Sequence, residues 1–205
     1  MSHYFENDEN LVSEIKPFSI NINGVLFDFN TDNGVFSKGE LDFGTNLLIR
    51  NVLKLSISSD VLDLGCGYGA IGIILSKLTN SNITMSDVNR RAIHLAKMNA
   101  KKNNVVVNTV VSDGYDSISC KFDYVISNPP IRVGKKKLYE LLIDTKEHLK
   151  ENGELIIVVR KEQGALSLIK DMSSYYKVHV LDKEKGFFII SLKNCWLILW
   201  FVLLI

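Results

Sequence analysis

From residue 60 onward the sequence alternates short apolar runs with amphipathic segments, and this alternation restricts the possible fold more than any other feature. Five runs have the length and composition of buried strands, at residues 61–64, 83–86, 105–111, 122–127 and 155–159. Helical segments are expected between them, at residues 70–78, 90–103, 135–150 and 163–172. Strands that are joined by crossover helices specify a parallel sheet with helices on both faces.

The two ends of the domain are expected to add antiparallel pairs. Residues 177–181 and 187–192 read as strands whose short connection leaves no room for a helical crossover, so the last strand of a seven-stranded sheet should run antiparallel. Near the N-terminus, Asn23-Gly24 separates two runs of alternating apolar residues, which is the pattern of a β-hairpin. A helix is expected over residues 43–55.

These elements predict one α/β domain over residues 1–194, with the hairpin and first helix in residues 1–57 and the core in residues 58–194. Residues 195–205 carry no charge and have no place in that sheet. As a helix this tail would rise about 16 Å, against roughly 30 Å for the hydrocarbon core of a bilayer, so it cannot span a membrane alone. Three roles stay open: an unrelated read-through end, a segment folded over the domain, or a contact with a membrane interface, which we do not expect.

The composition excludes several classes of protein. Hydrophobic residues make up 46% of the 205 residues, so extensive disorder is not expected. The net charge is +1, so any binding of nucleic acid must use a local basic patch. Three cysteines and four histidines are dispersed along the chain, which predicts neither a metal site nor a disulfide framework. The first residues lack a basic or apolar leader, and we expect a cytoplasmic protein.

The first strand-to-helix turn of the core has the composition of a cofactor site. Asp63 ends the strand, and the glycines within residues 65–69 let the backbone approach a ligand or simply pack tightly. Residues 67–72 also satisfy GxGxxG, a pattern typical of dinucleotide binding. The carboxylate of Asp63 favours the ammonium group of S-adenosylmethionine (SAM) over a pyrophosphate. Asp87, which ends the next strand, is placed for ribose hydroxyls under either interpretation.

A second chemical motif follows the fourth strand, where Asn128 precedes Pro129 and Pro130. Proline can simply make a rigid turn there, because it fixes φ and has no N–H to donate. The same three residues also place an amide oxygen beside a carbonyl that has no competing donor. Two such acceptors can hold both hydrogens of a planar amine and position its nitrogen for attack. The motif therefore predicts methylation of an amino group.

Together the residues Asp63 to Gly69, Asp87 and Asn128 to Pro130 resemble the class I SAM-dependent methyltransferases, in the branch that methylates amines. The sequence is more closely similar to the small-subunit ribosomal RNA guanine-N2 methyltransferases over residues 18–194. Three further segments resemble this family as well: Phe36-Ser37, residues 41–45 and residues 153–155. It implies a Rossmann-like fold, SAM as cofactor and an exocyclic guanine amine of rRNA as acceptor.

The resemblance also implies a role for individual residues. The methionine half of SAM would be held by Asp63, Gly65, Cys66, Gly67, Tyr68 and Gly69. The ribose would be held by Asp87 with Val88 beside it, and the adenine by Asp113 and Gly114. Asn128, Pro129 and Pro130 would form the catalytic motif. For Asp113 a solvated turn is the alternative interpretation.

The acceptor side carries one departure and one basic cluster. Ile131 stands where amino methyltransferases often place an aromatic residue that can stack on a flipped base. Arg132, Lys135, Lys136 and Lys137 follow, and these substrate-side charges are expected to contact phosphates of RNA or of an assembling small ribosomal subunit. A solvated helix start is the alternative interpretation of these charges.

Two further functions remain open from the sequence. The same Asn-Pro-Pro geometry would serve a protein glutamine amide or an adenine N6 amine. A protein that binds SAM or RNA without catalysis is the second alternative, although cofactor binding alone does not require an amide acceptor at Asn128. The sequence decides neither the acceptor nucleotide nor the oligomeric state.

Overall fold

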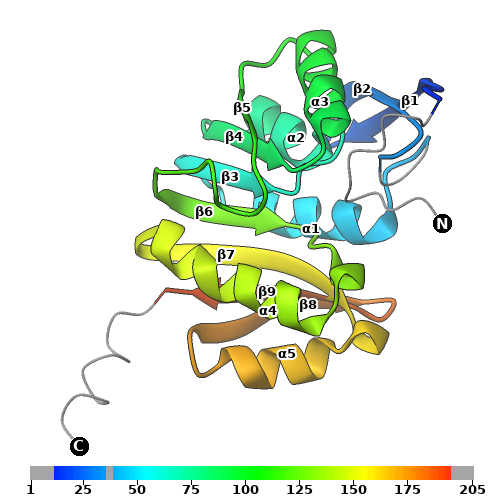
Figure 1. The fold of residues 1–205 in the computed structure, drawn as a ribbon. Coiled ribbons are helices and arrows are strands. Elements are labelled where there is room, and N and C mark those ends of the chain that lie inside the picture. The colour runs from blue at the N-terminus through cyan, green and yellow to red at the C-terminus, as the bar shows by residue number, and fades with distance from the viewer. Residues whose placement is uncertain (1–11, 36–38, 195–205) are drawn as a thin grey trace, which may run out of the picture.

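The computed structural model describes residues 12–35 and 39–194, and Figure 1 shows a central sheet between two layers of helices. The sheet has seven strands in the order β5-β4-β3-β6-β7-β9-β8. Their bounds are β3 (Asp60–Leu64), β4 (Asn82–Asp87), β5 (Asn108–Val111), β6 (Phe122–Ser127), β7 (Leu149–Arg160), β8 (Lys177–Glu184) and β9 (Phe187–Lys193). All pairs are parallel except those of β9, which confirms the predicted sheet with its antiparallel last strand.

Five α-helices cover the two faces of this sheet. Their bounds are α1 (Phe43–Lys54), α2 (Ala70–Leu78), α3 (Arg90–Lys102), α4 (Lys135–Asp144) and α5 (Ala165–Met172). Three short 3-10 helices are η1 (Ile131–Val133), η2 (Thr145–His148) and η3 (Lys161–Gln163). Helices α1 to α3 lie on one face, whereas α4 and α5 lie on the other, as Figure 1 shows.

The alternation of side chains along the strands divides the interior into two cores. In β7, Ile156 and Val158 belong to the core beneath α1 to α3, while Leu155, Ile157 and Val159 belong to the core beneath α4 and α5. All five side chains are buried. A strand with both faces covered reads as a continuous apolar run, and this explains why the strands were recognisable from the sequence.

The expected helix over residues 135–150 is wrong only at its C-terminal end, after residue 144. α4 ends at Asp144, where the Thr145 hydroxyl donates to the Leu141 carbonyl at 2.9 Å, and η2 leads directly into β7 at Leu149. Leu149 is buried and pairs with Phe122 of β6. Leu142 and Leu149 are seven residues apart, a spacing that fits two turns of a continuous helix. In the folded protein Leu149 instead begins a strand, because its side chain packs in the sheet.

Asn152-Gly153, which follows the expected helix, lies at an irregularity inside β7. The pairing moves from Phe122 with Leu149 to Tyr124 with Glu154, so extra residues of β7 bulge out of the ladder. Asn152 takes a φ of 62°, a left-handed conformation that asparagine tolerates. The predicted strand over residues 105–111 is also shorter, since β5 contains only Asn108–Val111.

The N-terminal hairpin is confirmed as a separate two-stranded sheet. β1 (Lys16–Ile22) and β2 (Val25–Thr31) pair antiparallel around Asn23-Gly24. These two turn residues have φ values of 51° and 83°, as a type I′ turn requires. The apolar side of the hairpin places Phe27 and Phe29 in the core beneath α3.

Two asparagines one turn apart, Asn99 of α3 and the C-cap residue Asn103, bind the backbone of β2. The Asn99 amide accepts from the Asn30 N–H at 2.8 Å and donates to the Asn30 carbonyl at 2.9 Å. Asn103 does the same with Asp28, at 3.0 and 2.8 Å. The buried Asn99 amide also donates to the Tyr68 carbonyl at 2.9 Å, so one side chain joins the hairpin to the glycine turn.

Replacing Asn99 by alanine should destabilise the protein by about 2–4 kcal/mol, because half-buried backbone groups of Asn30 and the buried carbonyl of Tyr68 lose their partners. Urea unfolding followed by circular dichroism measures the change. Lys97→Ala, on the exposed side of the same helix, is the control and should stay within about 0.5 kcal/mol of wild type. Equal stability of the two variants would contradict this role of Asn99.

Candidate active site

The candidate site lies where parallel strands end at the same edge of the sheet. β3 pairs with β4 on one side and with β6 on the other, so Asp63, Asp87 and Asn128 come to one edge from three neighbouring strands. Ligands of open α/β sheets bind outside this edge, at the point where the strand order reverses. In this sheet the reversal occurs at β3, since β4 and β6 flank it.

The glycine turn after β3 is held in shape by β4. The N–H groups of Gly65 and Cys66 both donate to the Ser86 carbonyl, at 2.8 and 2.9 Å, and the Gly67 N–H donates to the Asp87 carboxylate at 2.9 Å. Gly65, Gly67 and Gly69 have φ values of 71°, 56° and 90°. Side chains rarely adopt this conformation, so the turn requires glycine at these positions.

Asp63 is fully buried, and only one of its carboxylate oxygens has a partner. Oδ2 accepts from the Gly72 N–H at 2.8 Å, whereas Oδ1 has no hydrogen-bond partner among the described residues. Burial, with a smaller contribution from the charge of Asp87, raises the pKa of Asp63 to about 7. A cation donating to Oδ1 would satisfy this oxygen and favour the charged form. The Gly72 N–H at the start of α2, which a pyrophosphate could use, is already taken.

The Asp87 carboxylate has a different environment. Its two oxygens accept from the backbone N–H groups of Gly67 and Asn89, at 2.9 and 2.8 Å. Burial raises the pKa of Asp87, and these hydrogen bonds act in the opposite direction. A carboxylate can accept up to four hydrogen bonds, so Asp87 keeps capacity for ligand hydroxyls. Val88 beside it is half-buried.

The side chains of Cys66 and Tyr68 lie within the protein. The Tyr68 ring packs edge-on against Phe18 and Phe29 of the hairpin, with centroids 5.9 and 5.6 Å away. Burial raises the pKa of the Cys66 thiol well above its usual value, so it is no nucleophile at neutral pH. Cys66 and Tyr68 therefore contribute their backbone groups, and not their side chains, to the surface of the turn.

Asn128 has a partner that was not assigned a role from the sequence. Its Nδ2 donates to the hydroxyl of Thr45 at 2.9 Å, across 83 positions of the chain. Thr45 lies in the first turn of α1, where its N–H donates to Asp42, the N-cap of the helix. Because Nδ2 is committed to Thr45, the Asn128 Oδ1 atom is the end of the amide that remains to accept a proton donor.

Asp113 and Gly114, which were predicted to contact adenine, follow β5. Asp113 is exposed, and Gly114 has a φ of 51° and lies close to Leu141 of α4. The Ser112 hydroxyl closes this turn by donating to the Gly114 carbonyl at 3.0 Å. The turn therefore lies at the same sheet edge as the other motifs, beside α4.

The basic cluster after Asn128 is partly neutralised. Lys135 faces Asp171 at 3.2 Å and Lys136 faces Glu140 at 3.9 Å, while the side chain of Arg132 lies outside the described part of the structure. Lys137 is exposed, and no ion pair joins it to another described residue. Two of the three lysines are therefore paired with a carboxylate, and only Lys137 carries a positive charge that no described carboxylate balances.

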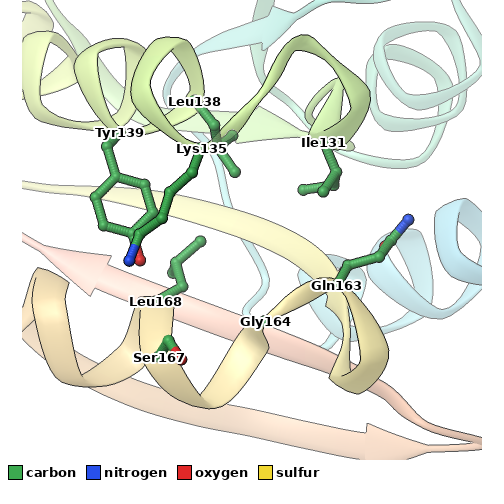
Figure 2. A pocket seen from close by; sticks show the side chains of 8 residues that line it. All are labelled: Ile131, Lys135, Leu138, Tyr139, Gln163, Gly164, Ser167 and Leu168. Carbon is green, nitrogen blue, oxygen red and sulfur yellow. The ribbon is translucent and has the colours of Figure 1, made fainter.

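A cavity of about 270 Å³ opens between α4 and α5 beside this cluster. Figure 2 shows Ile131 and Gln163 at one end of the cavity and Lys135 and Tyr139 at the other. Ile131 thus connects the Asn-Pro-Pro motif to the cavity.

Within residues 12–35 and 39–194, no group of three potential ligands could hold a metal ion, and none of the helices there is long and apolar enough to cross a membrane. Phe36-Ser37 and the tail over residues 195–205 lie outside the described residues.

Comparisons with known proteins agree with this arrangement. The family model for the methyltransferase small domain matches residues 26–191. The uncharacterized protein YbxB of Bacillus subtilis is 39% identical over 197 residues, which cover 94% of this chain and 98% of YbxB. The ribosomal RNA small subunit methyltransferase C of Haemophilus influenzae is 38% identical over 166 residues. That match covers 78% of this chain but 49% of the relative, so the chain spans about half of that protein's length.

Among solved structures, the fold is similar to that of a 16S rRNA N2 methyltransferase from T. thermophilus, determined in complex with AdoMet and guanosine. The TM-score is 0.78 at 20% identity, and the match covers 88% of this chain and 51% of the other. This likeness supports the Rossmann-like architecture that the strand order defines.

The raised pKa of Asp63 predicts a pH-dependent stability in the absence of cofactor. Between pH 3.8 and about 7 the unfolded chain loses this proton while the folded protein keeps it. The contribution of Asp63 to the free energy of unfolding therefore falls as the pH rises through that window. Asp63→Asn cannot ionise, so its stability relative to wild type should increase with pH in urea titrations.

Asp171→Asn serves as the control with the opposite sign. Hydrogen bonds from Tyr139 and Lys135 lower the pKa of Asp171 below its ordinary value of 3.8, so wild type should gain stability over this variant as the pH rises toward 3.8. Across the higher window of Asp63 the difference should stay nearly constant. A difference between Asp63→Asn and wild type that is constant across the window would contradict the raised pKa of Asp63.

Proposed function

The chain belongs to the methyltransferase small domain family, and from this premise we propose that it is a SAM-dependent N-methyltransferase acting on guanine N2 of small-subunit rRNA. The observation that carries the proposal is the Asn128 amide, which Thr45 holds at the edge where the glycine turn, the buried Asp63 carboxylate and the half-buried Asp87 carboxylate also lie. The family assignment confirms the predicted methyltransferase class with SAM as cofactor. The rRNA acceptor and the individual site residues form the proposed part.

The site residues fit SAM by their chemistry. When bound, SAM supplies an electrophilic methyl group. The unpartnered Oδ1 of Asp63 suits the ammonium group of its methionine half, which would lie along Gly65 to Gly69. Asp87 and Val88 are assigned to the ribose, and Asp113 and Gly114 to the adenine. SAM contains no pyrophosphate, so its binding does not need the Gly72 N–H at the start of α2, which already donates to Asp63.

On the acceptor side, Asn128 and Pro129 act by holding an amine. The Asn128 Oδ1 atom and the Pro129 carbonyl accept one hydrogen bond each from the two hydrogens of the target nitrogen. Thr45 keeps the amide in this orientation. Acceptors aimed at the hydrogens stabilise the pyramidal nitrogen that carries a growing positive charge during attack. Pro130 keeps the turn rigid, and Ile131 offers an apolar contact for the base.

The relatives favour an rRNA acceptor over protein or DNA. The Haemophilus influenzae protein, which is named for rRNA small subunit methylation, is 38% identical over most of this chain. Lys135, Lys136 and Lys137, with Arg132, are the sequence-based candidates for contacts with RNA. Protein glutamine and adenine N6 remain alternative acceptors, since the Asn-Pro-Pro geometry accepts each.

One experiment separates these acceptors. The protein is incubated with methyl-labelled SAM and, separately, with small-subunit rRNA, assembled small subunits, DNA and ribosomal protein. We expect label in rRNA or small subunits, recovered as N2-methylguanine after nuclease digestion. Label in N6-methyladenine or in protein would replace the proposed acceptor, and no transfer to any pool would indicate a binding protein without catalysis.

Removing the amide of Asn128 should abolish most transfer. Asn128→Ala is expected to lower turnover at saturating substrate by about 100-fold, the scale of one lost transition-state hydrogen bond, while SAM affinity changes much less. Thr45→Val should also lower turnover, whereas Thr45→Ser keeps the hydroxyl and should retain most of it. Near-normal turnover in Asn128→Ala would overturn its assigned role.

Loss of the carboxylate at Asp87 should act on cofactor binding. Asp87→Ala is expected to weaken SAM binding by about 1.5–3 kcal/mol, the scale of hydrogen bonds to a charged group. Isothermal titration calorimetry on the free protein measures this change. Unchanged SAM affinity, or tight binding of NAD by the wild-type protein, would contradict the cofactor assignment.

A further inference from the structure

A second group of cations lies at the active edge of the sheet, on the side away from α4. Arg160 ends β7, Lys161 begins η3, and Lys185 lies in the turn between β8 and β9. The backbones of these segments lie side by side, because Arg160 pairs with Phe187 across the strands and the Lys161 N–H donates to the Gly186 carbonyl at 2.8 Å. All three residues are exposed.

Aromatic rings, not carboxylates, hold two of these cations. The Arg160 guanidinium lies 4.5 Å from the centroid of Phe187, and the Lys185 ammonium lies 4.8 Å from that of Phe43. The two rings pack against each other with centroids 5.4 Å apart. A ring orders a cation but leaves its charge available, whereas a carboxylate cancels it. The group Arg160, Lys161 and Lys185, with these two rings, is called the cationic platform below.

The platform is in contact with the helix that positions Asn128. A Cβ atom on Gly44 would lie 2.7 Å from the Phe187 ring, so the ring packs directly on the backbone of Gly44. The next residue is Thr45, whose hydroxyl accepts from the Asn128 amide. Contacts therefore run from the platform through the start of α1 to the acceptor site. On its other side, η3 ends at Gln163, which lines the cavity shared with Ile131.

The platform has more unbalanced positive charge than α4 and is therefore the better candidate for binding an anionic ligand. No ion pair joins Arg160, Lys161 or Lys185 to a carboxylate in the part of the chain that the structure describes. Two carboxylates belong to the same segments: Glu162 is exposed, and Glu184 faces Arg50 at 3.6 Å. On α4, by contrast, Lys135 and Lys136 each face a carboxylate.

We propose that the cationic platform is the surface that binds the phosphate backbone of the RNA beside the nucleotide to be methylated. The proposal rests on the proposed function for the choice of RNA. Phosphates suit this surface because they carry charge at regular spacing and accept hydrogen bonds from Arg and Lys. The protein would then bind the RNA backbone where β7 ends and β9 begins, and this contact would place the target base beside Asn128.

The test compares two triple variants that each remove three positive charges. The platform variant carries Arg160→Gln, Lys161→Gln and Lys185→Asn, since asparagine tolerates the φ of 48° at position 185. The matched control carries Lys135→Gln, Lys136→Gln and Lys137→Gln. Binding of fluorescently labelled single-stranded RNA and of small-subunit rRNA is measured by anisotropy over a range of salt concentrations, without SAM. Thermal unfolding and SAM titration verify that both variants are folded.

The platform variant should lower the log–log salt slope by about two units and weaken RNA binding tenfold or more at about 0.15 M salt, as loss of three phosphate contacts predicts. The α4 control should lower the slope by about one unit or less. A third variant, Arg160→Lys, Lys161→Arg and Lys185→Arg, keeps the charges and should keep the slope. An unchanged slope in the platform variant, or an equal loss in the α4 control, would overturn the proposal.

The readouts distinguish this proposal from the proposed function. Binding is measured without methyl transfer, so wild type can fail to methylate rRNA while the platform still determines the salt slope. Conversely, if wild type methylates rRNA and the platform variant does so with an unchanged KM, the proposed function stands and the platform does not bind RNA. Loss of transfer to protein but not to RNA in the platform variant would also overturn the proposal.

Discussion

The hydrogen bond from the Gly72 N–H to the buried Asp63 carboxylate is the interaction on which the site depends. It joins the end of β3 to the first turn of α2 and so determines where the glycine turn between them lies. The bond satisfies only one oxygen of a carboxylate without access to water, and burial raises the pKa of Asp63 accordingly. An isolated buried carboxylate reduces the stability of the free protein, and a cationic ligand relieves that cost. The stability of the free protein and the proposed binding of the cofactor are therefore coupled at Asp63.

Backbone groups extend this arrangement in two directions. Asp87 binds the Gly67 N–H from the next strand, so the turn is held by two acidic side chains on neighbouring strands. Asn99 then joins the turn to the hairpin, because one amide binds both the Tyr68 carbonyl and the backbone of Asn30. The hairpin thus supports the glycine turn and also covers the core. A change in β2 should consequently affect the proposed cofactor site through Asn99.

The acceptor side depends on α1 in the same way. Asp42 caps this helix at Thr45, and Thr45 in turn orients the amide of Asn128. The same helix start packs on Phe187, which orders the Arg160 guanidinium. One helix N-terminus therefore links the proposed catalytic amide to the proposed RNA-binding surface. This linkage gives a physical reason why the segment before the core, and not only the Rossmann-like sheet, should matter for transfer.

The sequence alone determined the seven strands, the hairpin, the glycine turn and the Asn-Pro-Pro motif, because each depends on local periodicity or on the dihedral preferences of Gly, Asn and Pro. It misplaced the end of α4, where the spacing of Leu142 and Leu149 fits a helix and burial of Leu149 in the sheet decides otherwise. Only the tertiary structure revealed the partner of Asn128, because Thr45 is 83 positions away. It likewise separated Lys135 and Lys136 of α4, which face carboxylates, from the cations at Arg160 and Lys185, which lie on aromatic rings. Local conformation follows from neighbouring residues, whereas the partner of a side chain depends on which distant segments the folded sheet brings together.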